Sequence, residues 1–188
     1  MSKAKPLVFS AVSIALGLVL SMIKIIHMPL GGSITLCSML FVCLPGYFYG
    51  PIYGFSAAFA YGLLQFLFNG YVVSIPQVIC DYFLAFGALG LGCIFRKKRF
   101  GLILDYLTGL FGRFFFSFIS GVIFYGMYAS DYNLSAVVYS LLYNGAYILG
   151  EGIITILLLM IPALRNNIER IRESSVFTDE KANKISKE

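Results

Sequence analysis

The stretch from Val78 to Gly92, VICDYFLAFGALGLG, is apolar enough to lie in a membrane, yet Asp81 stands near its start. A carboxylate costs about 2.5 to 3.5 kcal/mol at the centre of a spanning helix, and such residues usually face a bundle interior or a water-filled cavity. The stretch therefore predicts a membrane helix in which Asp81 binds a ligand. The alternative is a carboxylate that only stabilises the N-terminal end of the helix dipole.

The composition of the whole chain is that of an integral membrane protein. Of the 188 residues, 59% are hydrophobic and 12% are charged, whereas soluble domains are about 25% charged. The four cysteines are scattered through apolar runs without companion histidines, a pattern that favours packing over a zinc site or a disulfide, so we expect no metal. The net charge of +5 does not point to nucleic acid, because the positions of the basic residues matter more than their sum.

Six apolar segments predict an all-α integral membrane protein with six transmembrane helices. A spanning helix needs roughly 20 apolar residues. The predicted spans cover about residues 7–26, 35–49, 51–68, 76–95, 102–127 and 137–163. The boundary between the second and third spans rests on LPGYFYGP, whose Pro and Gly residues break helices. We therefore expect one membrane domain over 1–165, followed by a charged cytoplasmic tail over 166–188.

The basic residues predict the orientation of these spans. Lys and Arg gather before the first span, in the RKKR segment between the fourth and fifth, and after the sixth; the opposite loops 27–34, 69–75 and 128–136 contain none. Because basic loops stay on the cytoplasmic side, this pattern places both termini in the cytoplasm. The chain has no G-x-x-x-x-G-K-[ST] motif for nucleotide phosphates.

Polar residues are concentrated in the predicted outer half of the bundle. Estimated at about 1.5 Å per helical residue, the depths of Asp81 and Asn144 are comparable, Ser117 lies somewhat deeper, and several tyrosines lie in the same outer half. The tyrosines are Tyr71, Tyr82, Tyr125 and Tyr139. A carboxylate, an amide and aromatic rings suit a flat, cationic, hydrogen-bonding ligand. For each tyrosine the competing interpretation is an interfacial aromatic belt.

Two further ionisable residues, Arg113 and Glu151, fall near mid-membrane on consecutive antiparallel spans. We expect them to form an ion pair. The pair could simply hold the fifth and sixth spans together, or it could form the floor of a cavity or respond to a partner subunit. On the first span, Ala11 and Ala15 form an A-x-x-x-A motif that allows close helix approach. Internal packing and docking to a partner both remain open for this motif.

Taken in order, four stretches resemble the thiamine-specific S components (the ThiT or YuaJ group) of energy-coupling factor vitamin transporters. They are GGSITLCSML, YGLLQFLFNGYVVSIPQVICDYFLAFGALGLG, GRFFFSFISGVIFYGMYA and VYSLLYNGAYILGEG, and the resemblance covers about residues 8–165. It implies a six-helix bacterial membrane protein that binds thiamine from outside without catalysis and needs no cofactor. It also implies partners, namely an EcfT-type transmembrane coupling subunit and two EcfA-type ATPases.

The resemblance also implies roles for particular residues. Asp81, followed by Tyr82, matches the acidic residue that binds the aminopyrimidine of thiamine. The other matches are Tyr71 to a tyrosine at the pyrimidine, Tyr139 and Asn144 to a Tyr and Asn pair of the site, Tyr125 to a stacking tryptophan, Arg113 to a lysine, Ser117 to a histidine, and Ala11 and Ala15 to the contact with the coupling subunit. The chain departs from the pattern by having no tryptophan and by carrying Asp where we expect Glu.

Several functions remain open at the level of sequence. The first is a thiamine-binding S component, and the second is an S component for another vitamin or for a precursor such as the hydroxymethylpyrimidine part alone. A membrane enzyme would need a metal-binding or nucleophilic constellation, which the single histidine and the scattered carboxylates do not favour. A channel would need a continuous polar path, and a purely structural subunit would leave Asp81 without a ligand.

Overall fold

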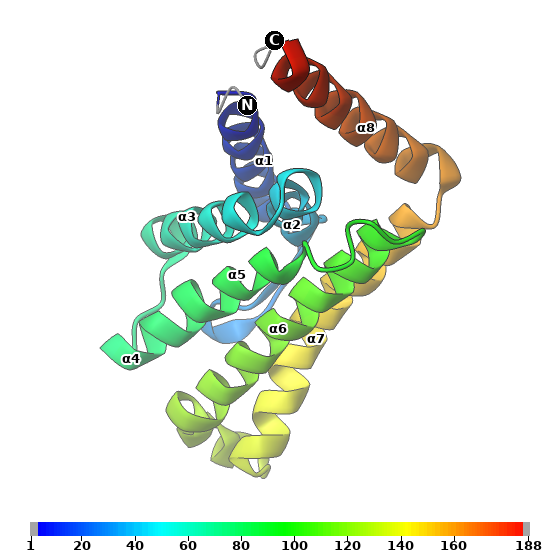
Figure 1. Ribbon diagram of the computed structural model, residues 1–188. Coiled ribbons are helices and arrows are strands. Elements are labelled where there is room, and N and C mark those ends of the chain that lie inside the picture. Colours follow the sequence, from blue (N-terminus) through cyan, green and yellow to red (C-terminus); the bar gives the residue numbers. More distant parts are fainter. Residues whose placement is uncertain (1–3, 186–188) are drawn as a thin grey trace.

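Helices make up most of the described residues (Figure 1). The computed structural model describes residues 4–185, with side chains described for residues 4–175. The long helices are α1 (Ala4–Met22), α2 (Ser38–Tyr49), α3 (Pro51–Asn69), α6 (Gly101–Phe124), α7 (Ala136–Leu159) and α8 (Pro162–Ile185). The shorter elements are β1 (Lys24–His27), η1 (Pro29–Gly31), β2 (Ser33–Thr35), α4 (Ile75–Val78), η2 (Ile79–Leu84), α5 (Ala85–Gly87), η3 (Ala88–Leu91) and η4 (Gly126–Tyr132).

Four helices, α1, α3, α6 and α7, are long and apolar enough to cross a membrane. The other two predicted spans form shorter apolar helices, Ser38–Tyr49 and Ile75–Leu91. The 12 residues of α2 rise only about 18 Å, which is less than the ~30 Å of a bilayer core. The all-α class is confirmed, while the count of six spans stays a prediction.

The first predicted span ended four residues too late. Helix α1 ends at Met22, and the chain continues into an antiparallel hairpin in which Lys24 pairs with Thr35 and His27 pairs with Ser33. Apolar content alone could not separate this hairpin from the helix, because Ile25 and Ile26 are as apolar as the helix that precedes them. Lys24 therefore lies in β1 and not at the end of a spanning helix.

The break between α2 and α3 falls at a single glycine. Pro45 lies inside α2, and the helix ends at Gly50, whose φ of +98° favours glycine strongly, before Pro51 starts α3. The two helices then pack at very short range, because a Cβ on Gly54 would lie 2.8 Å from Cα of Gly46. This close packing holds the end of α2 against the start of α3, next to the backbone of Gly90 and Gly92.

The outward faces of the bundle are apolar. Helix α1 turns Pro6, Ser10, Ser13, Gly17 and Ser21 inward. It exposes Leu7, Val8, Val12, Leu16 and Val19. This distribution is the reverse of that in a soluble helix and suits a surface in contact with lipid. Ala11 and Ala15 also lie on the exposed side of α1.

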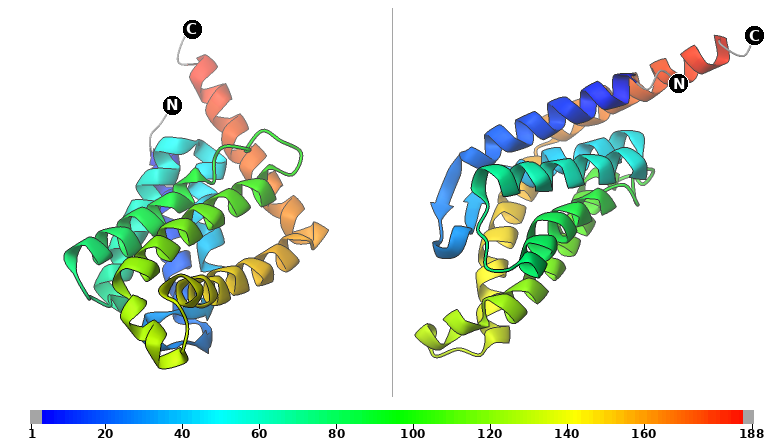
Figure 2. Two further views of the ribbon diagram at one scale, coloured as in Figure 1. Left: turned by 90° about the horizontal axis from the view of Figure 1, so that it is seen from below. Right: turned by 90° about the vertical axis from the view of Figure 1, so that its left-hand side faces the viewer.

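The two ends of the bundle differ. The start of α1 and the end of α8 lie at one end, and the β1–β2 hairpin lies at the opposite end (Figure 2). Helices α6 and α7 run side by side, and η4 connects them at the end that holds the hairpin. The segment 166–185 of the predicted tail is helical as part of α8; residues 1–3 and 186–188 of the predicted segments lie outside the described residues.

Candidate functional site

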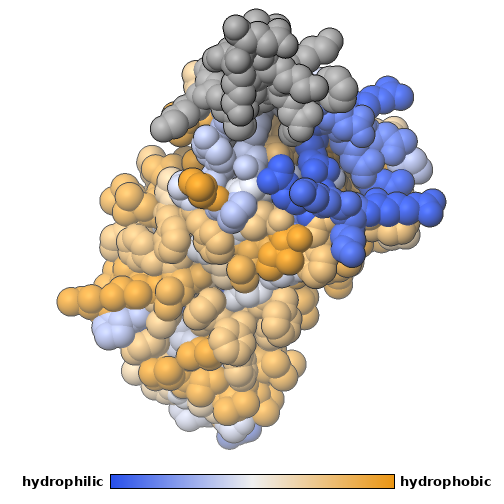
Figure 3. All heavy atoms as spheres, viewed as in Figure 1, coloured by the Kyte–Doolittle hydropathy of each residue, from blue (hydrophilic) through white to orange (hydrophobic). Residues whose placement is uncertain are grey.

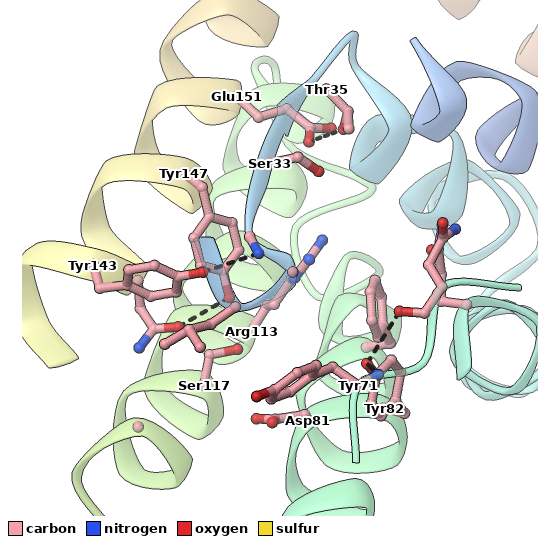
Figure 4. Close-up of a pocket in the computed structure, with 18 of the residues that line it drawn as sticks. Ser33, Thr35, Tyr71, Asp81, Tyr82, Arg113, Ser117, Tyr143, Tyr147 and Glu151 are labelled. Carbon is pink, nitrogen blue, oxygen red and sulfur yellow. Dashed lines mark hydrogen bonds between the residues drawn. The ribbon is translucent and has the colours of Figure 1, made fainter. Parts of the chain in front are cut away.

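A cavity of about 140 Å³ lies among the hairpin, α3, η2, α6 and α7. One water needs about 10 to 15 Å³ measured in this way, so the cavity can admit a small organic molecule. All seven predicted ligand-binding residues line it: Tyr71, Asp81, Tyr82, Ser117, Tyr125, Tyr139 and Asn144. Segments that are far apart in the sequence therefore meet at one site, as Figure 4 shows.

Asp81 lies in the π-helical turn η2, one of the short, wide turns that often occur at functional sites. Its Oδ2 accepts hydrogen bonds from Nε2 of Gln77 at 2.5 Å and from the hydroxyl of Tyr125 at 3.4 Å. Both of these hydrogen bonds end on Oδ2, and the carboxylate borders the cavity. A carboxylate has about four acceptor positions, so it can accept more hydrogen bonds than these two. The carboxylate can therefore accept a hydrogen bond from a ligand or balance its positive charge.

Gln77, which is completely buried, is a site residue that was not predicted. Besides Asp81, its Nε2 donates to the carbonyl of Tyr71 at 3.2 Å, and its Oε1 accepts from the N–H of Val73 at 3.1 Å. One side chain thus joins the loop between α3 and α4 to the site carboxylate. The only signal in the sequence was its position four residues before Asp81, which places both on one helical face.

Beside Asp81, two tyrosine rings form an aromatic wall. The rings of Tyr71 and Tyr125 are stacked with centroids 6.3 Å apart and an interplanar angle of 27°. The loop that holds Tyr71 is fixed by its own N–H, which donates to the hydroxyl of Tyr82 at 2.8 Å. At the outer edge, the hydroxyls of Tyr71 and Tyr128 are 3.4 Å apart. This wall can stack on a flat ring or contact a cation.

Helix α7 supplies a second aromatic wall across the cavity. Tyr139, Tyr143 and Tyr147 follow one another at four-residue spacing, so they lie on one face of the helix. The hydroxyl of Tyr143 accepts from the N–H of Gly32 at 2.9 Å and donates to the carbonyl of Pro29, which ties the hairpin loop over the cavity. Tyr143 and Tyr147 were missed, although their spacing from Tyr139 could have indicated them.

Asn144 lines the cavity but is already hydrogen-bonded. Its Nδ2 donates to the carbonyl of Ser140 at 3.0 Å, and its Oδ1 accepts from the hydroxyl of Tyr147 at 2.9 Å. Gly121 on α6 packs directly against this pair, since a Cβ there would lie 2.8 Å from Nδ2. Asn144 therefore orients Tyr147 in this structure, and Ser117 lies beside them on α6.

The predicted ion pair between Arg113 and Glu151 is wrong. Both residues line the cavity, but no ion pair joins them within the described residues. Glu151 instead accepts hydrogen bonds from the hydroxyl of Thr35, from Ser38 at 3.0 Å and from the N–H of Met39 at 2.9 Å. The depth of Glu151 could be estimated from residue counts. The position of β2 and the start of α2, which supply the hydrogen bonds to its carboxylate, could not.

Arg113 has a different partner. Its guanidinium carbon lies 4.1 Å from the ring centroid of Phe86, a cation–π contact. Figure 4 shows its side chain between Asp81 and Glu151. The cavity lining thus includes two carboxylates, Asp81 and Glu151, and two cationic side chains, Arg113 and Lys24. Within the described residues, no cluster of three or more His, Cys, Asp or Glu side chains is arranged to hold a metal.

Comparison with known proteins agrees with this architecture. Residues 7–170 match the model of the family described as thiamine transporter protein (Thia_YuaJ). A solved structure of ThiT from Listeria monocytogenes matches with 27% sequence identity and a TM-score of 0.70, covering 87% of this chain and 98% of that one. No curated protein sequence matches the chain. With its four helices of spanning length, the chain is a multi-pass bacterial membrane protein of thiamine transport, and it belongs to the thiamine transporter protein (Thia_YuaJ) family.

Proposed function

We propose that the chain is the thiamine-binding S component of an energy-coupling factor transporter, and that it captures thiamine from outside the cell. The observation that supports this most directly is the Asp81 carboxylate, which lies next to the stacked rings of Tyr71 and Tyr125 in one cavity. Thiamine combines a flat aminopyrimidine with a cationic thiazolium ring. The Asp81 carboxylate offers a hydrogen-bond acceptor and a negative charge, and the tyrosine rings offer aromatic faces for the two rings of thiamine.

In this proposal Asp81 accepts a hydrogen bond from the exocyclic amine of the pyrimidine. The aromatic wall of Tyr71 and Tyr125 stacks on one ring, and the tyrosines of α7 contact the other. Tyr82 acts on the ligand through the Tyr71 loop, whose backbone it holds. Ser117 hydrogen-bonds the ligand directly. Asn144, whose Nδ2 and Oδ1 already have partners, acts through the Tyr147 hydroxyl that it orients.

We further propose that the chain is not an enzyme and that its transport cycle depends on partner subunits. These are an EcfT-type coupling subunit and two EcfA-type ATPases, which would supply the ATP hydrolysis. Ala11 and Ala15, exposed on α1, form a surface of small side chains that another helix can approach closely. Docking of the coupling subunit there is an expectation from the family resemblance.

The proposed membrane arrangement has six apolar segments crossing the bilayer with both termini in the cytoplasm. The start of α1 and the basic 92–100 loop lie at the opposite end from the hairpin and η4 (Figure 2), as this arrangement requires. The helix α2 and the composite Ile75–Leu91 would be the two short crossings. The cavity then opens on the outer side.

A precursor such as hydroxymethylpyrimidine is the second candidate ligand. The observation in its favour is Arg113, whose guanidinium lies at the cavity and opposes a second cation there. A neutral pyrimidine would still use Asp81 and the aromatic wall of Tyr71 and Tyr125. Without a thiazolium ring to hold, the tyrosines of α7 would matter less.

Calorimetric titration of the purified full-length protein separates these candidates. The ligands are thiamine and its isolated pyrimidine, added to the protein alone in detergent. Binding of thiamine that is much tighter than binding of the pyrimidine supports the first proposal. Equal or tighter binding of the pyrimidine assigns the site to the precursor, and binding of neither would contradict both.

A further inference from the structure

Basic residues and exposed apolar residues meet at the end of the bundle opposite the hairpin. Figure 3 shows hydrophilic side chains gathered where α8 begins, next to a broad apolar surface. The segment Arg96–Arg99 lies in the loop before α6, and Arg165, Arg170 and Arg172 lie on α8. None of these residues takes part in the ligand cavity. Their concentration at one apolar boundary indicates a separate function.

Two of these arginines flank a single aromatic ring. The guanidinium carbons of Arg99 and Arg165 each lie 5.7 Å from the ring centroid of Phe100, although the two arginines come from different segments. Phe100 is 48% exposed. We call these three residues the arginine clamp. Neither guanidinium is fully used by protein groups, because Arg165 only approaches Glu169 at 3.9 Å and Arg99 has no hydrogen bond or ion pair within the described residues.

The loop that carries Arg99 is held in place from within the protein. Arg96 donates from Nη2 to the carbonyl of Phe48 at 3.0 Å, at the C-terminus of α2. The N–H of Phe95 donates to the buried carboxylate of Asp105 at 2.5 Å. The N–H of Lys98 donates to the carbonyl of Phe95 at 2.8 Å, which closes a turn. These hydrogen bonds hold the loop in one conformation, so Arg99 is presented at a fixed place.

The other arm of the arginine clamp is fixed as well. Helix α8 is attached to α2 by Arg172, whose guanidinium carbon lies 4.4 Å from the ring centroid of Tyr47 and whose Nη1 donates to the Tyr47 hydroxyl at 3.2 Å. Apolar residues border the clamp on both segments and are exposed: Ile94, Leu104, Ile161 and Leu164. Cations over an exposed ring beside such a surface match the boundary between phosphate headgroups and lipid chains.

We propose that the arginine clamp binds the phosphate diester of an anionic phospholipid at the membrane surface expected to face the cytoplasm. Guanidinium groups suit phosphate because they donate two parallel hydrogen bonds, and anionic lipid supplies a net charge that a zwitterionic lipid lacks. Phe100 and its apolar neighbours would contact the upper part of the lipid chains. The bound lipid would hold the 92–100 loop and α8 together at this end of the bundle.

Native mass spectrometry of the full-length protein in detergent tests this proposal, because it resolves each bound lipid. The probes are phosphatidylglycerol, phosphatidylcholine and inorganic phosphate. We expect phosphatidylglycerol to bind at least about ten-fold more tightly than phosphatidylcholine. Equal binding of the two lipids would overturn the proposal. Displacement of the lipid by an equal concentration of inorganic phosphate would overturn it too, since the site would then recognise a free anion.

Matched variants distinguish lipid binding at the arginine clamp from general electrostatic attraction to the basic surface. The double variant Arg99→Gln, Arg165→Gln removes two charges from the clamp, and Lys97→Gln, Lys98→Gln removes two exposed charges beside it. The clamp variant should lose about ten-fold or more in affinity for phosphatidylglycerol, and the lysine variant should lose clearly less. Equal losses would show non-specific attraction to the basic surface and overturn the clamp. Should the double variant fail to fold, Arg99→Gln and Phe100→Leu test the same site singly.

Discussion

Gln77 donates a hydrogen bond of 2.5 Å to the carboxylate of Asp81, and the same amide group holds the backbone of the loop that carries Tyr71. The carboxylate and the aromatic wall of Tyr71 and Tyr125 are thus positioned by one buried side chain. A neutral residue therefore links two parts of the site that the sequence presents as independent.

Replacing Gln77 with Met should weaken ligand binding more than it weakens the fold. The variant keeps the side-chain volume but removes the hydrogen bonds to Asp81, to the carbonyl of Tyr71 and from Val73. Hydrogen bonds to charged groups contribute about 1.5 to 3 kcal/mol, so we expect at least about a ten-fold loss of thiamine affinity. Calorimetry gives the affinity, and hydrogen exchange of residues 70–74 should accelerate in parallel. Unchanged affinity would show that Gln77 does not position the carboxylate.

Tyr143→Phe should release the hairpin loop from α7. The hydroxyl accepts from Gly32 and donates to Pro29, and neither bond can form without it. Two neutral hydrogen bonds of about 1 kcal/mol each predict a dissociation rate about five- to thirty-fold faster. Stopped-flow displacement of the bound ligand measures this rate. Tyr132→Phe is the matched control, because Tyr132 stacks on Tyr139 but its hydroxyl has no hydrogen bond within the described residues. Equal effects of both variants would contradict the role of Tyr143.

Glu151 should stabilise the fold independently of Arg113. Removing its carboxylate leaves the hydroxyls of Thr35 and Ser38 and the N–H of Met39 without their acceptor. Glu151→Ala should therefore lower the free energy of unfolding in detergent by about 2 to 3 kcal/mol. In a double-mutant cycle with Arg113→Gln, the two changes should add, because no ion pair joins the residues. A coupling energy above about 1 kcal/mol would contradict this result and support the ion pair that was predicted from the sequence.

Gly62→Ala should force α3 away from the turn that carries Asp81. A Cβ at Gly62 would lie 2.0 Å from the backbone carbonyl oxygen of Tyr82, and a backbone atom cannot rotate aside as a side chain can. We expect a loss of about 1 to 3 kcal/mol in stability, typical of overpacking. Gly145→Ala is the control, since its nearest atoms would be at an ordinary 3.9 Å. Thermal unfolding in detergent measures both, and equal stabilities would show that the α3–η2 packing can relax.

The residues that line the cavity were easier to predict from the sequence than the contacts between them. Asp81 and the tyrosines were found because polar groups are conspicuous in apolar segments, and all of them line one cavity. Gln77 and Tyr143 were missed because their importance depends on backbone partners in distant loops. The partner of Glu151 was predicted wrongly for the same reason. Depth along a helix is readable from residue counts, but the hydroxyls of Thr35 and Ser38 reach Glu151 only after the hairpin has folded.

Secondary structure was predictable where apolar segments are long. Helices α3, α6 and α7 lie close to their predicted ranges. The hairpin after α1 was not predictable, because Ile25 and Ile26 continue the apolar pattern and the strand pairing depends on residues six to eleven positions away. The π-helical turn at Asp81 also has no signal in apolar periodicity.

The central claim is that the Asp81 carboxylate binds thiamine, and the most direct test is calorimetric titration of thiamine into wild type, Asp81→Asn and Asp131→Asn. Asp131 lies exposed in η4 outside the cavity, so its variant removes the same charge without touching the site. Loss of a carboxylate that pairs with a buried ligand predicts an affinity at least about thirty-fold weaker for Asp81→Asn, with Asp131→Asn unchanged. Equal affinities of all three proteins would contradict the account.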